Sequence, residues 1–171
     1  MKIFRAYILI VLFLIPVSLN AQNKGQANPD DDKGWMAFGL GTAVNWDFSY
    51  SVNLNYGREL FFQGAFHRVE NISFGSDPNH INAISLGIGS SKVSRFGRLA
   101  FSPGLSFVFG KNYNDRLDKN SKFTSIGLLL NTQATFTPIK EVGMGLDMFM
   151  NLNKEEKFAG VVLTVFIEGN K

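Results

Sequence analysis

The sequence contains no cysteine, only two histidines and few charged residues. Charged residues make up 18% of its 171 residues, compared with about 25% in a typical soluble domain. The absence of cysteine excludes disulfide frameworks, zinc ribbons, iron–sulfur sites and thiol catalysis. An apolar content of 45% is too high for a disordered chain. The length fits one folded domain rather than two.

Long apolar runs are also absent, except at the start of the chain. Lys2 and Arg5 precede an apolar run of about 14 residues from Ala6 to Leu19, which is shorter than the roughly 20 residues of a membrane-spanning helix. This order is typical of a secretory signal peptide. We predict a signal peptide at residues 1–21 that is cleaved after Ala21. The alternative is an uncleaved membrane anchor. Residues 22–33 are polar and without apolar periodicity, so we expect a flexible lead-in to a single domain at 34–171.

Little net charge remains once the predicted signal is removed. The signal holds two of the 17 basic residues and none of the 14 acidic ones, which leaves a net charge of +1. Such a chain lacks the clustered basic face that nucleic-acid binding requires. It also contains no Gly-rich phosphate loop, HExxH helix motif or GxSxG motif. We therefore predict no nucleic-acid partner and no catalytic, cofactor-binding or metal-binding residues.

The mature chain does contain a long alternation of apolar and small residues with a period of two, which is typical of β-strands. It predicts an all-β protein with eight strands, at about 34–45, 47–57, 59–69, 81–91, 97–110, 122–137, 141–153 and 157–168. The apolar set stays on even positions across Asn45-Trp46-Asp47, which predicts an odd-length loop there. It changes parity near Phe96 and again after Gly110, which predicts even-length connections. The last strand is apolar on both phases, so its facing is ambiguous.

The composition of the strand face opposite the apolar one indicates whether the apolar face meets lipid or forms the interior of a soluble barrel. Its residues are Gly, Ser, Ala, Asn and Thr, and Asp147 is the clear mid-strand charge. A soluble barrel would carry many charges on this face, so we expect the apolar face to meet lipid and the small residues to fill a narrow lumen. Asp147 then points into the lumen, with His67 as a candidate partner. Pro103 predicts a bulge or kink in its strand.

Two further groups of residues indicate how such a barrel would meet its surroundings. The aromatic residues Trp46, Phe48, Tyr50, Tyr56 and Phe62 are expected to form interfacial girdles, whereas Trp35 falls on the small-residue phase. Residues 111–121 form the best candidate interaction site, because they mix Lys, Arg, Asp and Asn with one Tyr. They would contact phosphorylated lipid headgroups or another protein. A solvated loop of balanced charge is the alternative.

This pattern resembles the small eight-stranded outer-membrane β-barrel proteins of Gram-negative bacteria, over nearly all of the mature chain. The resemblance implies a closed antiparallel up-and-down transmembrane β-barrel, in the cell outer membrane and in contact with its lipid. We also expect a monomer. Members of this class act as surface adhesins, structural anchors, narrow channels or lipid-modifying enzymes. The chain departs from the class at its end, because Phe166 is followed by five further residues rather than closing the sequence.

We predict a structural or surface-interaction role without enzymatic activity. The alternatives are a narrow passive pore, a lipid-modifying barrel enzyme and an exported soluble ligand-binding barrel. Only His67 and His80 are candidates for a general base at neutral pH. His80 lies beside Ser76 and Asp77 in the sequence, but neither histidine forms a recognised spaced pair with a serine.

Overall fold

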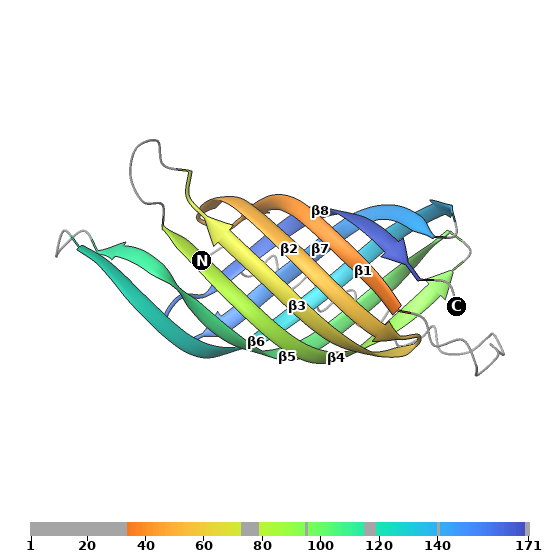
Figure 1. Ribbon diagram of the computed structural model, residues 1–171, viewed down its shortest axis with the longest axis horizontal. Coiled ribbons are helices and arrows are strands. Elements are labelled where there is room, and N and C mark those ends of the chain that lie inside the picture. Colours follow the sequence, from red (N-terminus) through yellow and green to blue (C-terminus); the bar gives the residue numbers. More distant parts are fainter. Residues whose placement is uncertain (1–33, 73–78, 95, 115–118, 140, 170–171) are drawn as a thin grey trace.

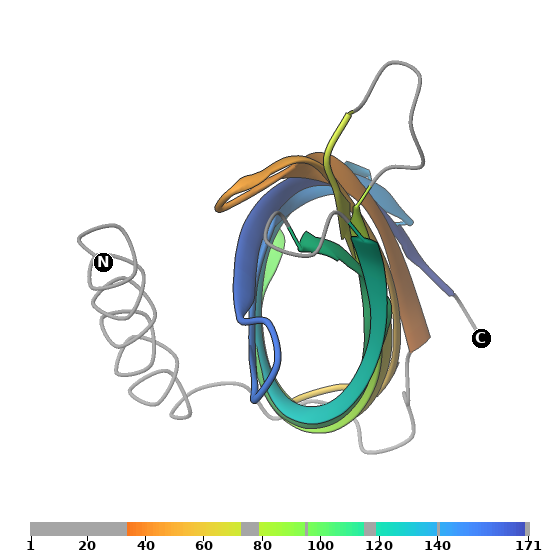
Figure 2. The same ribbon diagram turned by 90° about the vertical axis from the view of Figure 1, so that its left-hand side faces the viewer.

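The protein forms a single sheet of antiparallel strands that closes on itself. The computed structural model describes residues 34–72, 79–94, 96–114, 119–139 and 141–169, so the predicted signal peptide and lead-in lie outside the described residues. The strands are β1 (Gly34–Ala43), β2 (Trp46–Gly57), β3 (Leu60–Glu70), β4 (His80–Ser94), β5 (Gly97–Asn114), β6 (Lys119–Ile139), β7 (Val142–Asn153) and β8 (Phe158–Glu168). Each strand pairs with the next, and β1 pairs with β8 (Figures 1 and 2). The predicted all-β, eight-stranded closed barrel is therefore confirmed.

The two ends of the barrel differ in their connections. Short turns join β2 to β3, β4 to β5 and β6 to β7 at one end, called here the turn end. The paired strands β5 and β6 project beyond the opposite end, called here the ribbon end (Figure 1). Within the described part of the chain, no helix has the length and apolar character to cross a membrane.

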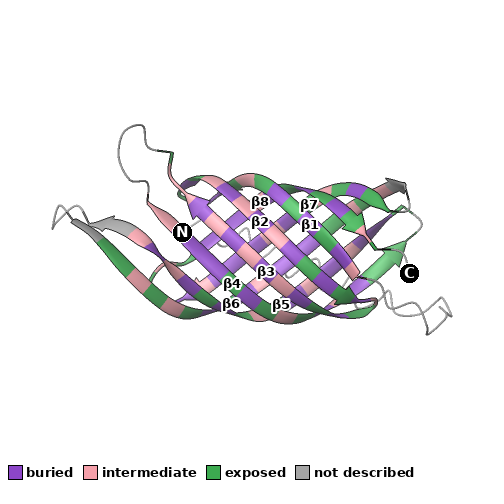
Figure 3. Ribbon diagram, in the orientation of Figure 1, coloured by how far each residue is buried: buried purple, intermediate pink, exposed green. Residues whose placement is uncertain are grey.

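Apolar side chains cover the outside of the barrel, and most polar strand residues point inward. Leu86, Leu105, Ile126 and Leu163 are each at least 70% exposed, although each lies in the middle of a strand. Each of them has at least one sequence neighbour on the other phase that is buried. Figure 3 shows this alternation of exposed and buried positions along the strands. The predicted apolar exterior of the barrel is confirmed.

The connection between β1 and β2 differs from the sequence prediction. A two-residue turn, Val44-Asn45, replaces the expected odd-length loop, and Asn45 adopts a left-handed conformation with φ of 66°. Even parity is kept because the register shifts by one residue between Gly41 and Ala43, which is a β-bulge. The same bulge turns Trp46 into the interior, where it is buried beside Ala43, so its predicted place in an exterior girdle was wrong.

The other parity predictions agree with the register of the strands. Ile84 pairs with Phe107, and Phe107 pairs with Ile126, so the apolar set changes parity on entering and on leaving β5. The ambiguity of the last strand is also resolved. Leu146 of β7 pairs with Leu163, which places the odd-numbered apolar residues of β8 on the exterior.

Pro103 causes no bulge. The β4–β5 register is the same on both sides of it, from Gly87↔Gly104 to Ser90↔Phe101. Between these two pairs the ladder is interrupted, since proline has no N–H group to donate. The ladder on the other side is continuous, and Pro103 pairs there with Leu130.

Residues 111–121 are largely strand rather than the predicted loop. Pairing between β5 and β6 continues from Lys111↔Lys122 to Asn114↔Lys119. The connection shrinks to residues 115–118, which lie outside the described residues. The pairing of β6 with β7 begins only at Gly127↔Asn153, so residues 119–126 of β6 extend past the last β7 pair. Residues 111–114 and 119–126 are called here the ribbon.

The closing pair of strands provides a test of the barrel. At Gly41 a methyl group would overlap the carbonyl oxygen of Val161 across the β1–β8 seam, whereas a methyl group at Gly64 meets no atom within 4 Å. Closed barrels resist denaturant and migrate faster on a gel unboiled than boiled. We expect this mobility difference for the native protein and for Gly64→Ala, and its reduction or loss for Gly41→Ala. Equal behaviour of the two variants would contradict the tight β1–β8 seam.

Candidate functional site: the barrel interior and the projecting ribbon

Asp147 lies in the interior of the barrel, as predicted, and is fully buried. The side-chain amide of Asn53 donates a hydrogen bond of 2.6 Å to its carboxylate, and the hydroxyl of Ser51 donates a longer one of 3.4 Å. Asn53 in turn accepts a hydrogen bond of 3.1 Å from Asn131. These bonds join β7, β2 and β6 across the lumen, and they hold the carboxylate through neutral donors rather than through a cation.

His67 is not the partner of Asp147 in these hydrogen bonds. Its ring is fully buried and packs against the ring of Phe149, with the centroids 4.4 Å apart. Neither ring nitrogen has a hydrogen-bond partner among the described residues. The expected pairing with Asp147 was therefore wrong, because the packing of His67 on Phe149 decides the orientation of the ring.

Further hydrogen bonds cross the interior at other heights. Gln63 of β3 accepts a bond from Ser102 of β5, Asn151 of β7 donates to Ser106 at 2.7 Å, and Trp35 of β1 donates to Gln133 of β6 at 3.3 Å. Each bond joins strands that are not neighbours in the sheet. The interior is thus cross-linked by side chains in addition to the backbone ladder.

Large aromatic residues fill the interior near both ends. At the turn end, Trp35, Phe61 and Phe166 form one buried cluster with Ala100. Arg98 lies over the Trp35 ring at 3.7 Å and forms an ion pair of 2.7 Å with Glu168. Toward the ribbon end a second buried cluster fills the lumen. It consists of Ala43, Trp46, Ala65, Val69, Ile81, Ala83, Val108, Leu129, Phe149, Phe158 and Val162.

Sequence reasoning predicted small lumen residues and missed most of these aromatic side chains. Two glycines explain how the rings fit in a narrow barrel. A methyl group at Gly89 would overlap the Phe61 ring, and one at Gly160 would overlap the Phe149 ring. The sequence signal for an interior ring was an aromatic residue on the small-residue phase, with a glycine paired to it on the neighbouring strand. The sequence analysis noted the phase of one such residue, Trp35.

The described residues provide little support for a catalytic or metal site. No group of three or more His, Asp or Glu side chains that would hold a metal ion occurs among them. His80 begins β4 and pairs in register with Glu70 and Lys111. Ser76 and Asp77, its neighbours in the sequence, lie outside the described residues. His67 is fully buried in the lumen, away from a substrate at the rim.

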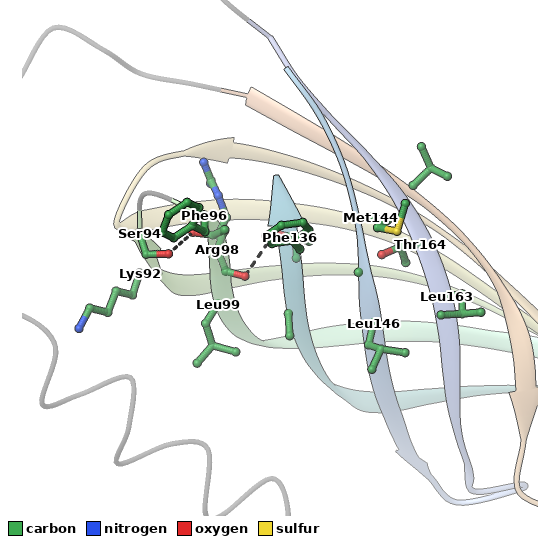
Figure 4. Close-up of a pocket in the computed structure, with 15 residues that line it drawn as sticks. Lys92, Ser94, Phe96, Arg98, Leu99, Phe136, Met144, Leu146, Leu163 and Thr164 are labelled. Carbon is green, nitrogen blue, oxygen red and sulfur yellow. Dashed lines mark hydrogen bonds between the residues drawn. The ribbon is translucent and has the colours of Figure 1, made fainter. Parts of the chain in front are cut away.

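An apolar depression lies on the outer wall of the barrel. Leu99, Leu146 and Leu163 line it from β5, β7 and β8 near the turn end (Figure 4). Their side chains lie on the same phase as the rest of the apolar exterior. The depression is therefore part of that exterior.

The ribbon is the main feature that rises above the barrel. Within it Ser121, Lys122 and Thr124 are exposed, whereas Phe123 is half-buried and packs against the interior cluster at the ribbon end. This contact fixes the two faces of β6 in the ribbon. Phe123 lies on the inner face, and Lys122 and Thr124 lie on the outer face.

The hydrogen bonds of Asp147 predict a specific pattern of stability. Asp147→Ala leaves the buried donors of Asn53 and Ser51 without an acceptor, which lowers the free energy of unfolding by about 1–3 kcal/mol. We expect Asp147→Ala and Asn53→Ala each to lower the free energy of unfolding, measured by urea titration of the protein folded in lipid vesicles. The double variant should lose less than the sum of the two losses, because both changes remove the same bond. Strict additivity would show that the bond contributes nothing.

Comparisons with known proteins place this geometry in a structural class. No family model matches the sequence, and no curated protein matches it. The N-terminal β-barrel domain of Pseudomonas aeruginosa OprF is similar with a TM-score of 0.59 and 15% identity, over 81% of this chain and 97% of that chain. Ail, the attachment invasion locus protein of Yersinia pestis, is similar with a TM-score of 0.59 and 10% identity, over 81% of this chain and 99% of that chain. Neisserial surface protein A is similar with a TM-score of 0.56 and 15% identity, over 80% of this chain and 95% of that chain.

These identities are low, and the likeness concerns the fold. It agrees with the closed ring of eight antiparallel strands and with the apolar exterior described above. The chain has the fold of the small eight-stranded outer-membrane β-barrel proteins.

Proposed function

We propose that the protein is a monomeric, non-enzymatic barrel of the outer membrane, which holds a surface-interaction element, the ribbon, outside the cell. The observation that carries this proposal is the contrast between the two parts of the molecule. The interior is filled and cross-linked by its own side chains, whereas β5 and β6 extend well past the strands beside them.

The distribution of side chains supports insertion in a membrane. A belt of exposed leucine, isoleucine, valine, methionine and phenylalanine surrounds the barrel. A patch of this extent is unfavourable in water, and closed barrels leave no unpaired strand edge in lipid. The similar structures come from outer-membrane barrels, which supports the outer membrane as the location.

The connections support one orientation of the barrel, although the two-residue β1–β2 turn at the ribbon end is as short as the β2–β3 turn at the opposite end. Outer-membrane barrels have short turns on the periplasmic side and longer connections outside. This supports an orientation with the turn end in the periplasm and the ribbon outside the cell. The names of two similar proteins, an attachment invasion locus protein and a surface protein, fit a surface role.

The filled interior argues against the alternative of a passive pore. Trp35, Phe61 and Phe166 occupy the lumen at the turn end, and the Arg98–Glu168 ion pair lies beside them. An eight-stranded barrel is only wide enough for side chains to fill. The burial of His67 argues against a rim enzyme that uses it as a base.

The orientation predicts which connection is accessible on intact cells. An epitope inserted between residues 115 and 118 should bind antibody without permeabilisation. The matched control is the same epitope between Arg58 and Glu59, in the β2–β3 turn at the opposite end. It should bind antibody only after the outer membrane is broken. The reverse result would invert the proposed topology.

The filled interior predicts that the native protein carries no measurable ion current. In planar bilayers we expect no stepwise conductance from the native barrel. Trp35→Ala removes the largest side chain of the cluster at the turn end together with its bond to Gln133. Any conductance that appears should be greater in this variant than in Phe62→Ala, which truncates an exterior ring. Regular single-channel steps from the native protein would favour the pore.

A further inference from the structure

The apolar depression near the turn end interrupts the coat of large side chains on the exterior. It has a volume of about 850 Å³, which lies in the range of pockets that bind small molecules. Lys92 of β4 stands at one border and Leu163 of β8 at the other, with β5, β6 and β7 between them (Figure 4). The depression therefore spans five neighbouring strands.

Small residues at two exterior positions account for the depression. Gly97 of β5 and Ala134 of β6 lie on the phase that carries large apolar side chains elsewhere on these strands. A methyl group at Gly97 would overlap the carbonyl oxygen of Thr135, so the close approach of β5 to β6 requires glycine there. Ala134 is exposed and stands between Leu99 and Leu146 in the register. A larger side chain at Ala134 would therefore fill the depression.

The depression runs obliquely from the rim of the turn end to the middle of the wall. The register places one row of residues along it, which consists of Lys92, Leu99, Ala134, Leu146 and Leu163. Lys92 lies two residues before the end of β4, whereas Leu163 is the central residue of β8. The row therefore begins close to the turns and ends halfway along a strand.

Lys92 gives the depression a positively charged border on the side of the turns. It is exposed and faces the exterior, because it pairs with Leu99. Phe96 and Phe136, which also line the depression near the turns, are 61% and 53% exposed. A lysine stem lies along apolar surface while its ammonium group remains in the polar layer. A molecule with an anionic head and an apolar tail is thus complementary to the depression.

We propose that the depression binds one phospholipid of the inner leaflet of the outer membrane, with an acyl chain on Ala134 and the phosphate beside Lys92. The choice of leaflet rests on the proposed function, in which the turn end faces the periplasm. An acyl chain is narrow enough to contact the floor at Ala134, whereas the convex wall of a second barrel would meet the borders of the depression. The charged border and the apolar row also match the two parts of a phospholipid.

The test compares two lipids that have the same acyl chains and differ in the headgroup. Purified protein, folded in detergent, is titrated with phosphatidylglycerol and with diacylglycerol, and bound lipid is measured by native mass spectrometry. The native protein should bind phosphatidylglycerol more tightly. Lys92→Gln should lower this affinity by about fivefold, the contribution of one basic residue near an anionic membrane surface, and leave the affinity for diacylglycerol unchanged. Ala134→Leu should lower the affinity for both lipids by about tenfold, because leucine replaces the contacts of the chain with the floor.

Each variant has a matched control elsewhere on the exterior. Gly64→Leu adds a large apolar side chain to β3, where an added methyl group meets no atom within 4 Å. Lys122→Gln removes an exposed lysine at the ribbon end. Both controls should bind the two lipids as the native protein does. Equal losses in Ala134→Leu and Gly64→Leu would overturn the depression as the chain site, and unchanged binding of phosphatidylglycerol by Lys92→Gln would overturn a phospholipid as the occupant.

The same spectra report the oligomeric state. A dimer that is lost in Ala134→Leu and kept in Gly64→Leu would identify a second copy as the occupant and overturn the proposal. The gel-mobility difference of each variant is measured in parallel, and its absence in the native protein would count against the membrane barrel of the proposed function. A native mobility difference in Ala134→Leu, together with unchanged lipid binding, would remove the phospholipid site alone.

Discussion

Closure of the sheet, which pairs each strand on both of its edges, determines the architecture of the protein. The proposed place in lipid requires this closure, because lipid offers no water to the hydrogen-bonding groups of the backbone. Each strand must be paired on both edges, so β1 must pair with β8 although they stand at opposite ends of the sequence. Closure of a small barrel brings the backbones close together at this seam, and Gly41 permits the approach. The tightness of the barrel also fixes the volume of the interior, which side chains then fill.

Much of the fold follows from a single periodicity. The alternation of apolar and small residues correctly indicates the number of strands, the facing of seven of them and the interior position of Asp147. It fails where local geometry breaks the period. The bulge between Gly41 and Ala43 reverses the facing of Trp46, and no residue type in that segment demands a bulge.

Prediction of the candidate site was less complete, for two physical reasons. Polar residues in 111–121 suggest a loop, but backbone pairing between strands needs no apolar side chains, and the hairpin continues from Lys111↔Lys122 to Asn114↔Lys119. The partners of Asp147 were also missed, because the shear of the barrel decides which residues meet across the lumen. Sequence spacing contains no information on the contact between Asn53 and Asp147.

The filled interior gives the molecule a stiff body, and the ribbon is a continuation of two of its strands. Phe123 of the ribbon packs against the buried cluster at the ribbon end of the interior. Such an arrangement positions an external element more precisely than a flexible loop would, because the scaffold of the element is the sheet itself.

The hydrogen bonds inside the barrel also have a consequence for the order of assembly. Asn53 and Asp147 are separated by 94 residues, Trp35 and Gln133 by 98. Contacts between such distant parts of a chain form slowly, since a long loop must close before they are made. A nascent barrel that lacks its last two strands has no acceptor for Asn53, and its interior stays open to water. The hydrogen bond between Asn53 and Asp147 therefore forms only after β7 has joined the sheet.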